Sequence, residues 1–332
     1  MAVPLDPNLL GLTALVTVGY QFMFFVIAAT FEIDTVTDLA GGTNFVVLAA
    51  MGLGVSEATS ARQVVCSSMV IVWGLRLSGF LLMRILQWGE DKRFDDKRSN
   101  LLAFAAFWVI QAIWVWSVSL PVTLLNGDSG GGAGAPFGTA SDVVGVVMWS
   151  LGFLVEVLAD QQKLAYKADP AHSGHWCDVG VWAWSRHPNY FGEILLWWGV
   201  FTTTASGFVP GGDAGVWVGA ILGPLLLTLL LLFVSGIPLL EDSADKRYGA
   251  RADYLEYKRV TSPLVPLPPS IYAALPGVVK GAVLCELAMY SRSLPTPSAG
   301  SDDSAHGGDQ GDGLYAAPDI VSESHAPPVE DP

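Results

Sequence analysis

Residues 184–198 read WSRHPNYFGEILLWW, a stretch that joins a polar lip to an apolar run. Four polar side chains crowd the start of a segment otherwise apolar enough to enter a bilayer: Arg186, His187, Asn189 and Glu193. Polar groups are costly there unless they serve a function. A helix that begins near Pro188 would stack Asn189 and Glu193 on one face and would have Arg186 and His187 at its positive N-terminal end. The pattern predicts a binding site for an anionic cofactor that bears an amide.

The composition is typical of a polytopic membrane protein. Apolar residues make up 52% of the 332 residues, charged residues make up 14%, and tryptophan occurs 12 times. A soluble core of this size does not need so large an apolar share. The first 292 residues therefore form the expected membrane-embedded domain, with the core of the cofactor site in residues 142–268.

Residues 293–332 differ from the rest of the chain. They hold eight of the acidic residues and no Lys or Arg, so more than half of the net charge of −14 lies in this segment. Ser, Gly, Pro, Ala and Asp dominate it, and aliphatic side chains are few. Such a segment cannot bury enough apolar surface to offset the entropy lost on ordering, so we expect a disordered acidic tail.

Apolar runs of bilayer-crossing length, about 17 to 25 residues, recur along the chain. They lie near 8–28, 63–86, 101–126, 142–162, 190–210 and 215–240, with a shorter seventh at 43–55. We therefore predict an all-α bundle of about seven transmembrane helices. No Lys or Arg precedes the first run, so we expect a retained helix and not a secretory signal.

The distribution of Lys and Arg predicts the orientation. Loop 87–100, segment 163–189 and the stretch after position 240 are rich in basic residues, whereas 126–141 and 206–216 contain none. The positive-inside rule puts the basic segments on the cytoplasmic side and the N-terminus outside or in the lumen. Arg62 is the one charge that disagrees. This topology gathers the polar blocks on the cytoplasmic face, where NADPH or S-adenosylmethionine is available.

Several separated motifs carry a family resemblance. They are SRHPNYFGE and LLWW in the stretch quoted above, SGIPLLE at 235–241, TSPLVP at 261–266, WGLRLSGFLLMR at 73–84 and GEDKRF at 89–94. Over about residues 15 to 268 the chain resembles the DUF1295 membrane family, which is related to the C-terminal domain of steroid 5-alpha-reductases. The resemblance implies an NADPH-dependent reductase of a conjugated carbon–carbon double bond in a steroid or other lipid.

The resemblance also implies roles for individual residues. Asn189 and Glu193 would hold the nicotinamide end, Arg186 and His187 the phosphates, and Asp160 the ribose or adenine side. Glu156 lies four residues before Asp160, where those reductases have an amide, so its role stays open. The full predicted cofactor-binding set is Asp160, Arg186, His187, Asn189, Tyr190, Glu193, Arg247, Tyr254 and Tyr257.

The tail of the membrane region, residues 239–266, alternates tyrosines with cations. Tyr248, Tyr254 and Tyr257 together with cations such as Arg247 suit adenine stacking and phosphate pairing. An amphipathic helix on an anionic membrane surface explains the same pattern. The two interpretations are compatible. Residues 271–289, which hold Lys280 and Glu286, predict an interfacial helix and not an eighth crossing.

Glu90 and Asp91 are the candidates for the catalytic acid. A carboxyl pair in a half-apolar cleft can hold a raised pKa and donate a proton. A solvated interfacial turn explains the pair equally well. Asp34 and Asp38 present a similar choice, because they either cap the next helix or line the site.

Two arginines fall within the predicted third crossing. Arg84 lies near the membrane boundary and is expected to extend toward the headgroups. Arg76 is deeper, so we expect a buried carboxylate partner, for which Asp34, Asp38 and Asp160 are the candidates.

Other functions fit parts of the pattern. Isoprenylcysteine carboxyl methyltransferases, which use S-adenosylmethionine, also have an RHP lip and a Tyr-rich tail. A lipid-binding protein without enzyme activity would explain the apolar bulk alone. HSGHWCD at 172–178 matches no zinc spacing, and we expect no metal. The expected partners are the bilayer and a lipid or steroid-like small molecule, with no nucleic acid, and the expected membrane is that of the endoplasmic reticulum.

Overall fold

The computed structural model describes residues 6–31, 33, 35–56, 60–88, 101–127, 134–208 and 212–294. The prediction of an all-α chain is confirmed, because these residues form helices and no named strand. The acidic tail, apart from its first two residues, lies outside the described residues, as do Asp34, Glu90 and Asp91.

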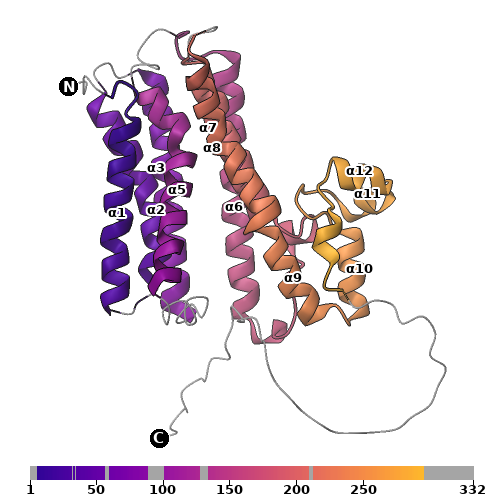
Figure 1. Ribbon diagram of the computed structural model, residues 1–332. Coiled ribbons are helices and arrows are strands. Elements are labelled where there is room, and N and C mark those ends of the chain that lie inside the picture. Colours follow the sequence, from indigo (N-terminus) through magenta and orange to yellow (C-terminus); the bar gives the residue numbers. More distant parts are fainter. Residues whose placement is uncertain are drawn as a thin grey trace, which may run out of the picture. The chain divides into compact units, whose positions relative to one another are not determined.

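The long helices are α1 (Leu10–Phe31), α2 (Thr35–Val55), α3 (Ala61–Trp88), α5 (Leu101–Asn126), α6 (Ala140–Ala168), α7 (Pro188–Ala205) and α8 (Ala214–Leu229) (Figure 1). Shorter elements follow: the π-turn η5 (Leu230–Val234), α9 (Ile237–Tyr248), α10 (Ala252–Val260), α11 (Pro269–Ala274) and α12 (Gly277–Ala282). The 3-10 turns are η3 (Pro170–His172), η4 (Gly180–Ala183) and η6 (Ala288–Ser291).

Six helical stretches of the described chain are long and apolar enough to cross a membrane: Leu10–Phe31, Val36–Val55, Ala61–Leu86, Leu101–Asn126, Ala140–Ala168 and Ala214–Tyr248. The protein is therefore an integral, multi-pass membrane protein. The short run at 43–55 belongs to a full span, because Gly and Thr residues before it interrupt the apolar pattern without ending the helix. α7, at the crossing predicted for 190–210, has 18 residues, about 27 Å of helix, and is not among these six stretches.

The chain divides into two compact units, and the division falls inside α6, α7 and α8. Unit 1 contains the described residues up to Val146 and Gly199–Leu226. Unit 2 contains Val147–Trp198 and the described residues from Leu227 onward.

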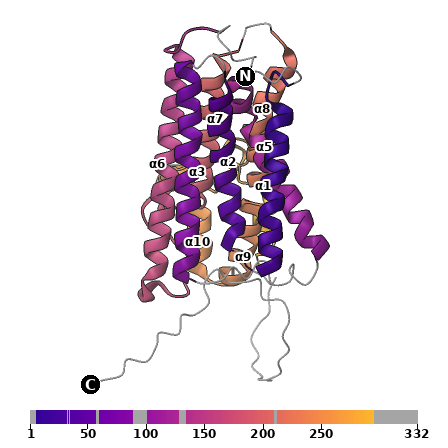
Figure 2. The ribbon, with the colours of Figure 1, turned by 90° about the vertical axis from the view of Figure 1, so that its left-hand side faces the viewer.

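Unit 1 is built around α2, which packs on α1, α3 and α5 (Figure 2). Its core includes Phe45 of α2, whose ring meets Trp73 and Trp114 edge-on at centroid distances of 5.2 Å. Polar side chains are paired between helices, as where the Gln21 amide nitrogen donates to the Asn44 oxygen at 3.1 Å. Such interhelical hydrogen bonds are a common cohesive feature of membrane bundles.

Arg62, the charge that disagreed with the predicted orientation, is buried at one end of unit 1. Its guanidinium forms a two-bond pair with the Asp142 carboxylate, at 2.7 and 2.8 Å, and also donates to the carbonyls of Ala135 and Pro136. The charge is therefore balanced within the protein. A buried, paired arginine carries less weight for orientation than a free cation in a loop.

In unit 2, α6 and α7 approach each other through Gly152 and Gly192. A Cβ at Gly192 would lie 2.5 Å from the Gly152 carbonyl oxygen and 2.7 Å from the Glu156 nitrogen. Only glycine allows this close approach of two helix backbones. The α6–α7 pair therefore fixes where α7 begins, and with it the polar lip.

Between α8 and α9 the helix changes register at η5. Ser235 N donates to the Leu230 carbonyl five residues earlier, at 2.9 Å, and Pro238 has no N–H to continue the ordinary pattern. Within unit 2, residues 227–248 run through this bulge into α9 (Figure 1), and we call this stretch the rod. Beyond the bulge, Glu241 of α9 lies against the start of α7, with Oε1 2.7 Å from His187 Nε2.

Candidate functional site

The link Ser185–Arg186–His187, between η4 and α7, is pinned by hydrogen bonds to the segment after α10. Ser185 Oγ donates to the Leu264 carbonyl at 2.7 Å, and Arg186 N donates to the Ser262 carbonyl at 2.8 Å. Pro188 then starts α7, as its fixed φ and missing N–H favour at a first helical position. The predicted start of the helix is confirmed.

Arg186 is buried and its guanidinium is engaged on several sides. Nη1 donates to the Lys258 carbonyl at 3.0 Å, Nη2 donates to Glu286 Oε1 at 2.9 Å, and Nε lies 3.2 Å from Glu241 Oε1. Burial lowers the pKa of Arg186, but the two carboxylates outweigh it and hold that pKa above its usual value. The side chain is a permanent cation inside the protein.

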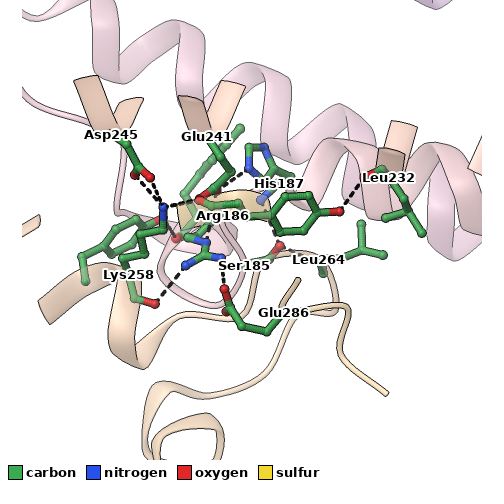
Figure 3. Close-up of polar contacts among 12 residues, drawn as sticks. Ser185, Arg186, His187, Leu232, Glu241, Asp245, Lys258, Leu264 and Glu286 are labelled. Atoms are coloured by element: carbon green, nitrogen blue, oxygen red, sulfur yellow. Dashed lines mark hydrogen bonds and ion pairs between the residues drawn. The ribbon is translucent and has the colours of Figure 1, made fainter. Parts of the chain in front are cut away.

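Glu241 and Asp245, one turn apart on α9, share the Lys258 ammonium (Figure 3). Lys258 Nζ lies 2.9 Å from Glu241 Oε2 and 2.5 and 2.7 Å from the two Asp245 oxygens. It also donates to the Tyr290 carbonyl at 2.6 Å. Tyr254 adds a hydroxyl donor to Asp245 at 2.8 Å. Charges removed from water persist only when paired and hydrogen-bonded in this manner.

His187 Nε2 lies 2.7 Å from Glu241 Oε1. Burial lowers the pKa of His187, although Glu241 opposes the shift, so we assign a neutral ring whose Nε2–H donates to the carboxylate. Nδ1 is then an acceptor, and it is buried without a hydrogen-bond partner. The Asn189 side-chain oxygen is a second buried acceptor without a partner. Two acceptors in one short segment could receive the donors of a polar ligand.

The charges around Arg186 are nearly balanced. Two cations, Arg186 and Lys258, face the carboxylates of Glu241, Asp245 and Glu286 (Figure 3). The hydroxyl of Tyr272 donates to the second oxygen of Glu286, which orients this carboxylate toward Arg186. An anionic ligand that used Arg186 would compete with Glu286, so the predicted phosphate role of Arg186 stays a prediction with this added condition.

Other predicted site residues differ in burial and contacts. Asp160 of α6 and Glu193 of α7 are half-buried, and the Tyr190 ring stacks on His187 at 5.8 Å. Arg247 is exposed, with its guanidinium 5.4 Å from the Tyr248 ring centroid. The predicted cofactor contacts of these residues stay predictions.

Tyr254 and Tyr257 are packed against Trp176. Their ring centroids lie 5.1 and 5.9 Å from the Trp176 ring, and the Arg251 guanidinium lies 5.0 Å from it. Tyr257 also donates its hydroxyl to the Trp182 carbonyl at 2.8 Å, and burial raises the pKa of both tyrosines. Adenine stacking would have to use ring faces that this cluster leaves uncovered.

The remaining predicted residues lie elsewhere or are not described. Glu90 and Asp91 fall outside the described residues, so the catalytic acid stays a prediction. Arg84 Nη2 lies 3.5 Å from Asp38 Oδ2, a loose pair where we expected extension to the headgroups. Arg76 lies over the Phe80 ring at 5.2 Å. His172 stacks on Tyr166 at 3.9 Å, and no cluster of three metal-ligating side chains occurs in the described ranges.

Comparison with known proteins identifies the family. The model of the family described as protein of unknown function DUF1295 matches residues 24–261. The chain belongs to the DUF1295 family. No curated protein and no solved structure matches it. The DUF1295 match contains Arg186, His187, Glu241 and Lys258, whereas Glu286 lies beyond it.

Sequence reasoning missed the acidic half of this DUF1295 site. Glu241 and Asp245 are four residues apart on a helix that follows an apolar run, which is a detectable signal for paired carboxylates. Their partner Lys258 appeared only as one cation among several. Glu286 lies 100 residues from Arg186 along the chain, and no local pattern indicates that contact.

Proposed function

We propose that this DUF1295 protein is a membrane-embedded reductase that uses NADPH to reduce a conjugated carbon–carbon double bond in a steroid or other lipid. The observation that carries the proposal is the pair of buried, unpartnered acceptors, His187 Nδ1 and the Asn189 oxygen, at the start of α7. The motif RHPNYFGE resembles that of steroid 5-alpha-reductases, and this resemblance supports the reaction class and the nicotinamide cofactor.

The side chains at this start fit the amide end of a nicotinamide cofactor. A carboxamide presents N–H donors, and the Asn189 oxygen is an acceptor in need of one. Glu193, one turn further on α7, offers further acceptors on the same face. His187 Nδ1 suits a hydroxyl such as those of a ribose. When bound, the cofactor would supply the hydride.

Glu241 has a positioning role in this proposal. Its hydrogen bond to His187 Nε2 fixes the tautomer in which Nδ1 is the acceptor. Its ion pair with Arg186 holds the link before α7 in place. The cofactor phosphates would pair with Arg186 after displacing Glu286, or with basic residues at the rim such as Arg247.

The orientation belongs to the same proposal. Basic residues at 163–189 and after position 240 favour the cytoplasmic side for the site, with the N-terminus outside or in the lumen. The endoplasmic reticulum suits a lipid substrate. The proton donor stays with Glu90 or Asp91 as predicted candidates.

Cofactor binding tests the proposal. The protein in detergent would be melted with and without NADPH, because a ligand that binds only the folded state stabilises it, by about 2.7 kcal/mol at a hundred times its Kd. We expect NADPH to raise Tm, Asn189→Ala to abolish the shift, and Asn189→Asp, which keeps an acceptor oxygen, to retain part of it. Glu256→Gln, an exposed change on α10, should leave the shift intact.

Two outcomes would overturn the reductase proposal. A Tm shift with S-adenosylmethionine and none with NADPH would indicate a methyltransferase. No shift with either cofactor, in a protein that melts cooperatively, would favour a lipid-binding protein without this chemistry. An NADPH shift that persists in Asn189→Ala would place the cofactor away from the start of α7.

A further inference from the structure

Residues 262–285, which follow α10, are nearly free of charge. Lys280 is the only charged residue in these 24 positions, which include α11 and α12. The segment lies beyond the DUF1295 match. We call residues 269–284, which contain both short helices, the apolar hairpin.

The apolar hairpin exposes large aliphatic side chains. Val278 is 82% exposed, Val283 is 65% exposed and Ile271 is 51% exposed. Lys280, the one cation, has its ammonium 4.4 Å from the centroid of the Tyr272 ring. A cluster of uncovered aliphatic side chains on a soluble surface marks a binding face. The partner must therefore be apolar.

The position of this segment against the apolar part of unit 2 favours lipid as the partner. The residues just after the hairpin pack on the apolar part of the rod, where Leu232, Ile237, Leu264 and Tyr290 form a buried cluster with Ile194 and Leu287. Tyr290 donates its hydroxyl to the Leu232 carbonyl at 2.7 Å. Leu232 precedes Glu241 by nine residues, which is roughly 13 Å of helix. In Figure 1, α11 and α12 lie above α9 and α10, away from the charged end of the rod.

Much of the hairpin backbone has its N–H groups paired within the segment or lacks them. Pro268, Pro269 and Pro276 have no N–H to satisfy. The N–H groups of Ile271, Tyr272, Leu275, Val279, Lys280, Val283 and Leu284 all donate to carbonyls within the segment, at 2.9 to 3.3 Å. In the hydrocarbon of a bilayer, unsatisfied backbone groups cost several kcal/mol each, so this pairing is a requirement for immersion.

We propose that the apolar hairpin dips into the acyl region of the bilayer from the same side as α9 and α10, without crossing it. Val278, Val283 and Ile271 contact lipid chains, and Lys280 reaches back over Tyr272. Glu286 lies two residues after the hairpin and contacts Arg186, so lipid contact anchors one wall of the candidate site. The proposal rests on the membrane-spanning fold and stands whether or not the protein binds NADPH.

Fluorophore labelling in vesicles tests the depth. Val278→Cys, and separately Val283→Cys, would be introduced into a chain whose native cysteines are replaced by alanine, labelled with an environment-sensitive dye and reconstituted into phosphatidylcholine vesicles. Leu154→Cys is the lipid-facing control, because Leu154 is 52% exposed on the span α6. Glu256→Cys on the charged face of α10 is the water-facing control. Melting curves verify that each labelled chain is folded.

Two kinds of quencher measure whether each label is exposed to water or to the acyl chains. We expect the labels at 278 and 283 to match the Leu154 control, with loss of quenching by aqueous iodide and strong quenching by a nitroxide on the middle of the acyl chain. Iodide quenching equal to that of the Glu256 control would overturn the proposal. Quenching by a headgroup nitroxide alone would also overturn it, since the hairpin would then lie on the interface.

Discussion

At the residue scale, Glu241 connects the polar lip to the rest of unit 2. Its two oxygens lie within 3.2 Å of donor atoms of Arg186, His187 and Lys258. All four side chains are at least 93% buried. A buried network of this kind contributes less net stability than its short distances suggest, but removing one member leaves an uncompensated charge.

Lys258→Met tests this asymmetry. The change leaves Asp245 and Glu241 without their shared ammonium, so we expect a loss of about 3 to 5 kcal/mol in the free energy of unfolding. The measurement is Tm in detergent. The matched control is Arg259→Met on the same helix, whose partner Glu256 is exposed, and it should melt like the parent. An equal decrease in Tm for the two variants would contradict a special cost of removing the buried ammonium.

His187 gives a pH dependence with a definite sign. Its folded-state pKa is lowered by burial, against the opposing carboxylate of Glu241 and with the cations Arg186 and Lys163 nearby. An unfolded histidine takes up a proton near pH 6.5, whereas buried His187 does so only at lower pH. The stability contributed by this group is complete above about pH 6.5 and falls as the pH drops below that value.

His187→Gln checks this sign by keeping a side-chain donor for Glu241 without a group that titrates. We expect the Tm of the parent protein to fall further than the Tm of the variant when the pH is lowered from 7.5 to 5.5. Parallel Tm profiles for the two proteins would show that His187 does not titrate differently in the folded and unfolded chains.

At the element scale, the position of the site depends on the contact between α6 and α7. Gly192 belongs to the NYFGE stretch that begins α7, and it lies against Gly152 and Glu156 of α6. The same residue run thus carries Asn189 and Glu193, for which ligand contact is predicted, on one face and a backbone contact with α6 on another. This explains why a glycine stands between Asn189 and Glu193 in a helix.

Gly192→Ala tests the helix contact. The new methyl group would lie 2.5 and 2.7 Å from backbone atoms of α6, so the two helices must separate, at an expected cost of about 1 to 3 kcal/mol. The control is Gly79→Ala in α3, where a Cβ meets nothing within 4 Å, and where helix propensity predicts a gain of about 0.5 to 1 kcal/mol. The measurement is the Tm of both variants relative to the parent protein. A neutral Gly192→Ala would contradict the close packing.

At the scale of the whole molecule, contacts within unit 1 bring distant loops to one end of its helices. Arg62 pairs with Asp142, the Thr139 hydroxyl lies 3.1 Å from the Ser206 hydroxyl, and a Cβ at Gly127 would meet the backbone of Asn8 at 2.7 Å. These loops are the ones poor in basic residues. Helices that alternate in direction, as the apolar runs predicted, produce this gathering.

Cysteine accessibility tests the orientation. In a chain without native cysteines, Ala140→Cys marks the end with few basic residues and Glu256→Cys marks the segment after position 240. A membrane-impermeant maleimide should label position 140 from the outer or lumenal side of sealed membranes, and position 256 only after permeabilisation. The reverse labelling pattern would show that the protein is inserted in the opposite orientation and that the positive-inside rule fails for it.

The sequence by itself determined the elements of this protein. Length and hydrophobicity of the runs fixed five of the six long spans, and Pro188 marked the start of α7, because these are local properties that act within a few turns of chain. The sixth, Val36–Val55, was predicted only as 43–55, because Gly and Thr residues before that run interrupt the apolar pattern without ending the helix.

Only the tertiary structure decided how the candidate site is assembled. Arg186 contacts Lys258, 72 residues away, and Glu286, 100 residues away. Asn189, three residues after Arg186, retains an acceptor oxygen without a hydrogen-bond partner. The sequence showed the residue types but not the pairings. The energy of a buried charge depends on which partner lies within about 3 to 4 Å, and that is set by helix packing rather than by neighbours along the chain.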